Sequence, residues 1–142
     1  MDDAGAVGLM SKVGYAVPDG FHLILIQHFH DASNSVIDTS RTVSRRTSIV
    51  ITGIRQGDSL VNFLWDDGVY TTVSTPIAGA SRPGTGDIFA SILAADAVRG
   101  ETLLSSVQKA ANFVGLCIAG SEKAGTPVQE GVVFEKYLAA LL

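Results

Sequence analysis

The sequence predicts an α/β fold in which a mixed sheet with a β-meander is followed by three helices. Three observations support this fold class. Residues 48–77 hold short runs rich in β-branched and aromatic residues, and an Asp-Gly pair separates two of these runs. After residue 87, apolar residues recur at helical spacing. A length of 142 residues suits one domain and leaves little room for two independent cores.

The strands are predicted from runs of apolar residues. Residues 22–29 are apolar in the middle, and residues 48–52 are β-branched and nearly all apolar, as in a strand covered on both faces. Gly53 is expected to end that strand. Residues 60–65 and 69–77 follow, and the Asp66-Asp67-Gly68 turn between them favours positive φ and therefore a type I′ hairpin. The Gly- and Ala-rich residues 1–20 are expected to be loosely structured or to form a short amphipathic piece.

The helices are predicted from periodicity and from their ends. Apolar residues at 88–97 lie at helical spacing, and Gly100 is a natural stop. A second helix is expected from Thr102, which can act as its N-cap, with an apolar stripe that reaches Ile118. The break at residues 125–127 precedes a third helix over residues 133–141. The polar stretch 31–46 is expected to be a loop and a short solvated helix.

Composition and charge exclude several functional classes. A formal net charge of −4 provides no basic face for nucleic-acid binding. The single cysteine, Cys117, can form neither an internal disulfide nor a Cys-based zinc cage, and helical spacing predicts a buried, inert thiol. The apolar run at residues 23–26 is too short to cross a membrane, and the first residues lack the basic start of a secretory signal. We therefore expect a cytoplasmic protein that does not bind membranes.

The segment before the first predicted helix carries the strongest chemical signal. Gly84 and Gly86 allow the backbone to turn sharply, and the helix that begins there directs unpaired N–H groups and the positive end of its dipole at one spot. A phosphate is the commonest occupant of such a place. Asp87 in the first turn could act as a general base for a hydroxyl that attacks this phosphate. Taken alone, the same residues also fit a tight turn with a favourable dipole partner.

For several other polar residues the sequence allows both a functional and a structural interpretation. Arg82 adjoins the Gly84 turn and could reach a phosphate or point to water. Arg41, Arg45 and Arg46 could do the same, but such a cluster is more often a solvated helix face. His28 and His30 would share one face of a strand at a spacing that can bind zinc, although polar edge-strand residues are the commoner explanation and no metal site is predicted.

Several motifs, in family order, resemble the ribokinase-like superfamily of small-molecule kinases. The segment Gly84-Thr85-Gly86-Asp87-Ile88-Phe89-Ala90-Ser91 resembles its carboxy-terminal signature, and Ala110-Ala111-Asn112 is similar to the segment that lines the adenine pocket. Residues 49–54, 58–63 and 131–135 most resemble bacterial pyridoxal/pyridoxamine kinases. The resemblance covers roughly the last two-thirds of the chain. It implies a Rossmann-like partial domain over residues 47–142 and leaves residues 1–46 unassigned.

The resemblance implies roles for individual residues. Asp87 would take the proton from a primary hydroxyl, and the backbone N–H groups of Gly84, Thr85 and Gly86 would surround the γ-phosphoryl group of ATP. Further contacts with ATP are implied for the phosphates and the adenine, at Thr52, Gly53, Ala78, Gly79 and Asn112, with Arg82 as an additional candidate. The implied reaction transfers phosphate from MgATP, with ATP and Mg²⁺ as cofactors, to pyridoxal, pyridoxine or pyridoxamine, the vitamin B6 vitamers.

Two departures from the family keep alternatives open. Family members are considerably longer, and their amino-terminal half, which supplies most of the vitamer pocket and the lid, is not recognisable in this chain, so that the chain resembles a truncated kinase. The Asn-x-x-Glu element that organises magnesium and phosphate in the family is absent, because neither Asn34, Asn62 nor Asn112 has Glu three residues later. The chain would then be a non-catalytic nucleotide-binding module, or a kinase for a sugar or another small alcohol. Related hydroxymethylpyrimidine kinases tend to carry Cys where this chain has Asp87, which favours the pyridoxal or sugar branch. An exposed sheet edge would favour self-association, as in a homodimer.

Overall fold

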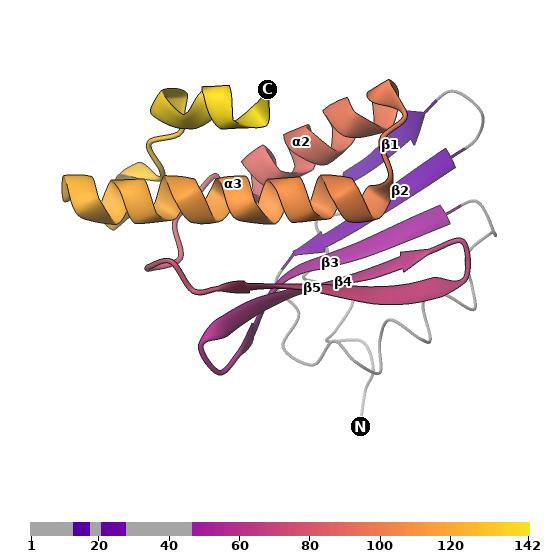
Figure 1. The fold of residues 1–142 in the computed structure, drawn as a ribbon, viewed down its shortest axis with the longest axis horizontal. Helices are drawn as coiled ribbons and strands as arrows, with labels where there is room; N and C mark the ends of the chain where they lie inside the picture. Colours follow the sequence, from indigo (N-terminus) through magenta and orange to yellow (C-terminus); the bar gives the residue numbers. More distant parts are fainter. Residues whose placement is uncertain (1–12, 18–20, 28–46) are drawn as a thin grey trace. The chain divides into compact units, whose positions relative to one another are not determined.

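A computed structural model describes residues 13–17, 21–27 and 47–142 (Figure 1). The described residues contain one sheet with strand order β1-β2-β3-β4-β5. They form two compact units, of which one holds β1, β2 and most of β3 and β4. The other holds the end of the β3–β4 hairpin, most of β5 and the helices. The predicted α/β class with a mixed sheet is confirmed.

The first unit contains both parallel and antiparallel strand pairs. Strand β1 (Val13–Val17) pairs antiparallel with β2 (Phe21–Gln27), with Tyr15 opposite Leu23. Strand β2 runs parallel to β3 (Thr47–Gln56), with Ile24 opposite Ile49. Strand β1 falls in the segment expected to be loose or amphipathic, so that expectation was wrong for its five residues. The prediction for residues 31–46 lies outside the described residues.

Strand β3 continues through Gly53, which was predicted to end it. Gly53 has a φ of +73° within the strand, a left-handed conformation that glycine adopts without strain. Its N–H donates to Oδ1 of Asn62 at 3.2 Å, so a side chain of the neighbouring strand supplies an acceptor where the backbone departs from β geometry. The strand therefore passes the irregular residue and reaches Gln56.

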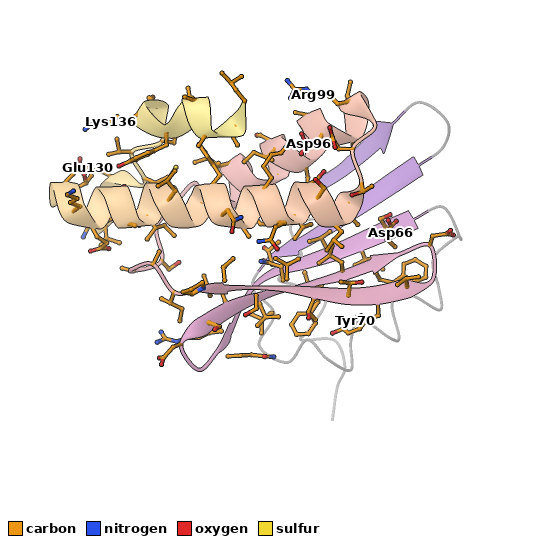
Figure 2. The ribbon with its side chains drawn as sticks, in the orientation of Figure 1. Asp66, Tyr70, Asp96, Arg99, Glu130 and Lys136 are labelled. Carbon is orange, nitrogen blue, oxygen red and sulfur yellow. The ribbon has the colours of Figure 1, made fainter. Side chains whose placement is uncertain are left out.

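The predicted β-meander is present. Strands β4 (Ser59–Asp66) and β5 (Val69–Pro76) are joined at Asp67 and Gly68, whose φ values of 45° and 82° are those of the predicted type I′ turn. Near this turn, the Ser48 hydroxyl donates to the Asp66 carboxylate. The rings of Phe63 and Tyr70 stack with centroids 6.0 Å apart; Asp66 and Tyr70 are labelled in Figure 2.

Helices α2 and α3 of the second unit begin and end close to the predicted positions. Helix α2 (Thr85–Arg99) ends at Gly100, whose φ is 78°. Helix α3 (Leu103–Ala124) begins after Thr102, whose Oγ1 accepts from the Ser105 N–H at 3.2 Å, as expected of an N-cap. The two helices pack against each other.

The third predicted helix is a 3₁₀ helix. A short turn, η3 (Val128–Glu130), follows the break after α3, and η4 (Glu135–Leu141) contacts α3. The Tyr137 ring lies against Gly120, where an added Cβ would overlap its hydroxyl group and ring. A glycine in α3 thus makes room for an aromatic ring of η4, and this long-range contact is not visible in the periodicity of either segment.

The interior of α3 matches its predicted stripe. Val107 and Ala110 are fully buried, and Cys117 is buried as predicted. Burial, and secondarily the charge of Glu135, raises the pKa of Cys117 to about 11, which keeps the thiol protonated and unreactive at neutral pH. By length and composition alone, α3 could also cross a membrane, a test that core helices of soluble proteins pass too.

A partly buried ion pair joins α2 to α3. Asp96, on α2, has a side chain only 3% exposed, and Lys109 Nζ lies 2.9 Å from its Oδ1 and 2.8 Å from its Oδ2 (Asp96 is labelled in Figure 2). The sequence pattern did not reveal this pair, because Asp96 occupies a position at which an apolar residue would continue the stripe of α2.

We expect Lys109→Met to destabilise the protein. Removing the cation leaves the Asp96 carboxylate buried without a partner, at a cost of about 3 kcal/mol. Urea denaturation followed by circular dichroism would measure this loss. Lys123→Met, which removes an exposed lysine from the same helix, should cost less than about 1 kcal/mol. Equal losses in the two variants would contradict a special role for the Asp96–Lys109 pair.

Candidate functional site

The amino-terminal end of α2 presents free backbone donors. Gly84 precedes the helix with φ +83° and ψ −12°, and no side chain caps this end. The first intrahelical bond runs from the Ile88 N–H to the Gly84 carbonyl at 3.1 Å. The N–H groups of Thr85, Gly86 and Asp87 precede that bond and so have no acceptor within the helix. Free N–H groups and the helix dipole are the features by which helix amino termini commonly bind anions, and the predicted anion hole stays a prediction.

Asp87 is exposed in the first turn of α2. Its main-chain carbonyl accepts from the Ser91 hydroxyl at 2.7 Å, and its carboxylate has no hydrogen-bond or ion-pair partner among the residues the structure describes. The carboxylate is therefore free to meet a ligand beside the helix end. Its assignment as a general base stays a prediction.

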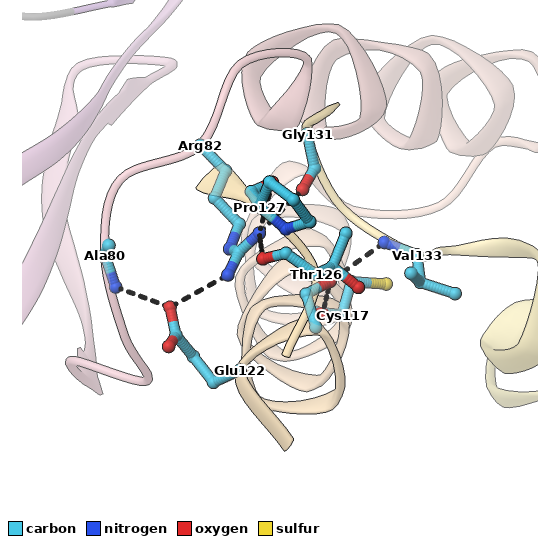
Figure 3. Close-up of polar contacts among 9 residues, drawn as sticks. Ala80, Arg82, Cys117, Glu122, Thr126, Pro127, Gly131 and Val133 are labelled. Atoms are coloured by element: carbon cyan, nitrogen blue, oxygen red, sulfur yellow. Dashed lines mark hydrogen bonds and ion pairs between the residues drawn. The ribbon is translucent and has the colours of Figure 1, made fainter. Parts of the chain in front are cut away.

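The Arg82 side chain is buried, with the residue only 4% exposed. Its Nη1 donates to the carbonyl oxygens of Thr126, Pro127 and Gly131 at 3.0, 3.3 and 3.1 Å, and its Nη2 lies 3.1 Å from Glu122 Oε1 (Figure 3). The guanidinium thus faces protein oxygens at the end of α3 and in the segment after it. Burial contradicts the alternative in which Arg82 points to water, and its predicted contact with a phosphate stays a prediction.

Glu122 ties the loop before α2 to the end of α3. Its Oε1 accepts from the Ala80 N–H at 3.2 Å and from Arg82 (Figure 3). Gly79 lies so close that an added Cβ would come within 2.6 Å of Glu122 Cγ. The hydrogen bond from Arg82, followed by that from Ala80, lowers the pKa of Glu122 below its ordinary value. Ala78, Gly79 and Arg82 therefore belong to a loop held at one carboxylate.

Asn112 lies apart from that loop. It is exposed on α3, where its Oδ1 accepts from the Gln108 amide at 3.2 Å. Ten residues of α-helix separate it from Glu122, a rise of about 15 Å. The resemblance implied that Asn112 and the Ala78–Gly79 loop border the same adenine, but the structure holds the loop at the opposite end of this helical stretch.

Thr52 and Gly53 lie in strand β3, in the first unit. Thr52 is buried, and the Gly53 N–H already donates to Asn62. Their predicted contact with ATP phosphates stays a prediction. His28, His30 and the three arginines between residues 41 and 46 lie outside the described residues.

Sequence reasoning missed Glu122, the residue that accepts from both Ala80 and Arg82. One local signal could have drawn attention to it. A carboxylate in the last turn of a helix opposes the helix dipole, so such a residue usually needs a cation nearby. The cation is Arg82, which lies forty residues away in the sequence, so its identity could not be deduced from this signal.

Comparison with known proteins identifies the family. Residues 18–132 match the phosphomethylpyrimidine kinase family, and this range begins within the segment that sequence analysis left unassigned. No protein of curated function matches the sequence significantly.

Solved structures share the fold. A candidate phosphomethylpyrimidine kinase from Bacteroides thetaiotaomicron matches with a TM-score of 0.72 and 21% identity, over 84% of this chain and 47% of that one. Pyridoxal kinase from Lactobacillus plantarum matches with a TM-score of 0.70 and 21% identity, over 82% of this chain and 43% of that one. Pyridoxal kinase from Entamoeba histolytica matches with a TM-score of 0.56 and 18% identity, over 74% of this chain and 36% of that one. This chain thus spans less than half of the length of these proteins.

A free helix amino terminus in an α/β fold is a common feature of phosphate-binding proteins. The fold is that of the pyridoxal kinase-like proteins. With most of its length matched by one family, the chain belongs to the phosphomethylpyrimidine kinase family. The predicted ribokinase-like fold and kinase relationship are confirmed at this level, whereas the division of the chain at residue 46 stays a prediction.

The stability of the protein should depend on the charge of Glu122. A carboxyl group with a lowered pKa in the folded state contributes stability that is full above its unfolded value of about 4.5 and is lost as pH falls through the folded pKa. Wild type should therefore exceed Glu122→Gln in thermal stability near neutral pH, and the difference should shrink as the pH falls below 4.5. A difference in melting temperature that is independent of pH would contradict this account.

Proposed function

We propose that this protein binds MgATP and transfers its γ-phosphoryl group to the primary hydroxyl of a small heteroaromatic alcohol. The observation that carries this proposal is the uncapped amino terminus of α2, where three N–H groups lack an intrahelical acceptor beside the exposed Asp87. Membership of a kinase family implies that ATP is the phosphate donor.

In the proposed mechanism, two of these N–H groups, those of Thr85 and Gly86, and the N–H group of Gly84 before them bind the oxygens of the transferring phosphoryl group. Their directions are fixed by the backbone, so they need no reorganisation as charge develops, and each such donor contributes about 3 kcal/mol to transition-state stabilisation. The Asp87 carboxylate accepts the proton of the attacking hydroxyl as the oxygen–phosphorus bond forms. ADP leaves with the electrons of the bond that breaks.

Magnesium would enter this site with the nucleotide. The described residues hold no cluster of three or more His, Cys, Asp or Glu side chains that could form a protein cage for an ion. Mg²⁺ commonly keeps several waters and binds through one or two carboxylates and the phosphates of its substrate. Asp87 is the carboxylate nearest the proposed phosphate site along the chain, and when bound the ion would neutralise phosphate charge.

The proposed acceptor is pyridoxal, pyridoxine or pyridoxamine. One crystal form of the Bacteroides thetaiotaomicron protein contains pyridoxal, and its TM-score to this chain is 0.65. Asp87 stands where related hydroxymethylpyrimidine kinases tend to carry Cys, which favours the same acceptor. A hydroxymethylpyrimidine, named by the family, and a sugar are the acceptors to be tested beside it.

A second candidate is a nucleotide-binding module without catalysis. The share of the solved structures that this chain covers, 47% and 43% for the two with the highest TM-scores above, favours it. Isothermal titration with MgATP and then with pyridoxal distinguishes the two candidates. Binding of both ligands supports a kinase, whereas binding of MgATP alone supports the module.

Cytoplasmic location and self-association stay part of the proposal. Exposed apolar side chains in the second unit support an association surface for a second copy of the chain. They include Phe134, Leu138 and Leu142.

We expect Asp87→Asn to remove turnover and leave MgATP affinity nearly unchanged. The amide cannot accept the hydroxyl proton, so the rate should fall by a factor of about 10² to 10⁴. A coupled assay of ADP release with pyridoxal measures the rate, and titration calorimetry measures the affinity. Asp67→Asn, at the exposed β4–β5 turn, is the matched control and should change neither. Full turnover by Asp87→Asn would refute the general-base assignment.

We expect Gly84→Ala to weaken MgATP binding through the backbone alone. An added Cβ meets no atom within 4 Å, but the φ of +83° costs an alanine about 1–2 kcal/mol. Relaxation of this strain would turn the following N–H groups and lower affinity roughly tenfold. Gly84→Asn, whose side chain tolerates the left-handed region, should lose less. If both variants bind as well as wild type, these amides do not hold the phosphate.

A further inference from the structure

We propose that Arg82 and Glu122 are positioning residues that hold the anion-binding turn in its binding geometry. We call the two side chains, with the carbonyls of Thr126, Pro127 and Gly131, the clasp. This inference rests on the proposed function, because it assigns the clasp to the same phosphate site. It goes beyond that function in placing part of the nucleotide affinity in residues that do not touch the nucleotide.

The clasp reaches the turn through two contacts. The main-chain carbonyl of Arg82 accepts from Thr85 Oγ1 at 3.0 Å, so Arg82 joins the end of α3 through its side chain and the first residue of α2 through its backbone. Gly131 has a φ of +80°, and a Cβ atom added to it would lie 3.0 Å from the carbonyl oxygen of Pro83. The backbone immediately before Gly84 is therefore enclosed on the side of residue 131.

Glu122 fixes the other end of the same loop. One atom, Oε1, accepts from the Ala80 N–H and from Arg82 Nη2 (Figure 3). The loop is thus held at Ala80 by Glu122 and at Thr85 by Arg82, with Gly84 next to the second anchor. These two anchors restrict the rotation of the intervening peptide groups.

The bonding of Arg82 is poorly explained by stability alone. Its Nη1 is shared among three carbonyls, and its Nε is buried without a hydrogen-bond partner among the described residues. A buried guanidinium with an unsatisfied donor carries a desolvation cost that an apolar side chain of similar volume would avoid. What the arginine provides is direction, since its planar fork meets acceptors from two segments at fixed angles.

The test compares variants of the clasp with a matched exposed arginine. Arg82→Met removes the fork, Glu122→Ala removes the acceptor, and Glu122→Gln keeps an acceptor oxygen without the charge. Arg99→Met removes an exposed arginine from the last turn of α2 and is the control. Two readouts are taken on folded protein: MgATP affinity by calorimetry, and ¹⁵N order parameters of Gly84, Thr85 and Gly86 with Val107 in α3 as the reference.

We expect Arg82→Met and Glu122→Ala to lower MgATP affinity about tenfold or more. The order parameters at residues 84–86 should fall from about 0.85 toward 0.6, while that of Val107 is unchanged. Glu122→Gln should lie near wild type in both readouts, because the acceptor is retained, and Arg99→Met should change neither. If Arg82→Met does not fold, the comparison of Glu122→Gln with Glu122→Ala gives the same test.

Two results separate failure of this inference from failure of the proposed function. Clasp variants that lose thermal stability while affinity and order parameters at residues 84–86 equal those of wild type would overturn the positioning role. A wild-type protein that does not bind MgATP would refute the proposed function. In that case the order parameters alone decide whether the clasp holds the turn.

Discussion

Burial of the Arg82 guanidinium removes a permanent cation from water, and the chain must supply acceptors for it. These acceptors come from residues 40 to 49 positions further along the sequence, at the end of α3 and in the segment after it. The turn that enters α2 and the segment that leaves α3 are thereby joined at one side chain. The direction of the free N–H groups at the start of α2 is thus a property of the whole second unit. It could not be set by Gly84 and Gly86 alone, because glycines permit a turn without specifying it.

The amino termini of α2 and α3 differ in their capping. At the start of α3 the Thr102 hydroxyl accepts from the Ser105 N–H, so that one fewer N–H group is available to a ligand. At the start of α2 the residue before the helix is a glycine, which has no side chain to cap with, and the first-turn carboxylate carries no protein partner among the described residues. The end of α3 shows the opposite polarity, since Glu122 opposes the helix dipole there and is compensated by Arg82. Of the two amino termini, that of α2 therefore leaves more N–H groups without a side-chain cap than that of α3 does.

Local signals explain which parts of the fold could be predicted. The Asp67-Gly68 turn, the Thr102 cap and the Gly100 stop each depend on neighbours in the sequence, and the structure has each of them. Where β3 continues beyond Gly53, the Gly53 N–H donates to the side-chain oxygen of Asn62, and the Tyr137 ring fits against Gly120, so neither feature follows from a local pattern. Strand β1 did carry a signal, because Val13, Tyr15 and Val17 alternate with small residues, but its glycine argued against a strand. In the site, residues 84–87 were found from their motif, whereas the contacts of Arg82 and Glu122 connect distant segments and required the structure.

The position of the candidate phosphate site in the chain bears on two activities, nucleotide binding and phosphoryl transfer. The turn at residues 84–86, Asp87 and the clasp all lie between residues 80 and 131, within the second unit. The direction of the N–H groups in this turn depends on the clasp, so under the proposed function nucleotide affinity should follow the integrity of this unit. Phosphoryl transfer demands more, because the acceptor hydroxyl must be held about 3 Å from the phosphorus and in line with the bond that breaks. In the proposed mechanism Asp87 is the base for that hydroxyl, whereas none of the residues of the turn and the clasp is assigned to the acceptor ring. Under the proposed function, nucleotide binding and phosphoryl transfer therefore place different demands on the chain, and acceptor recognition would come from residues outside the turn and its clasp.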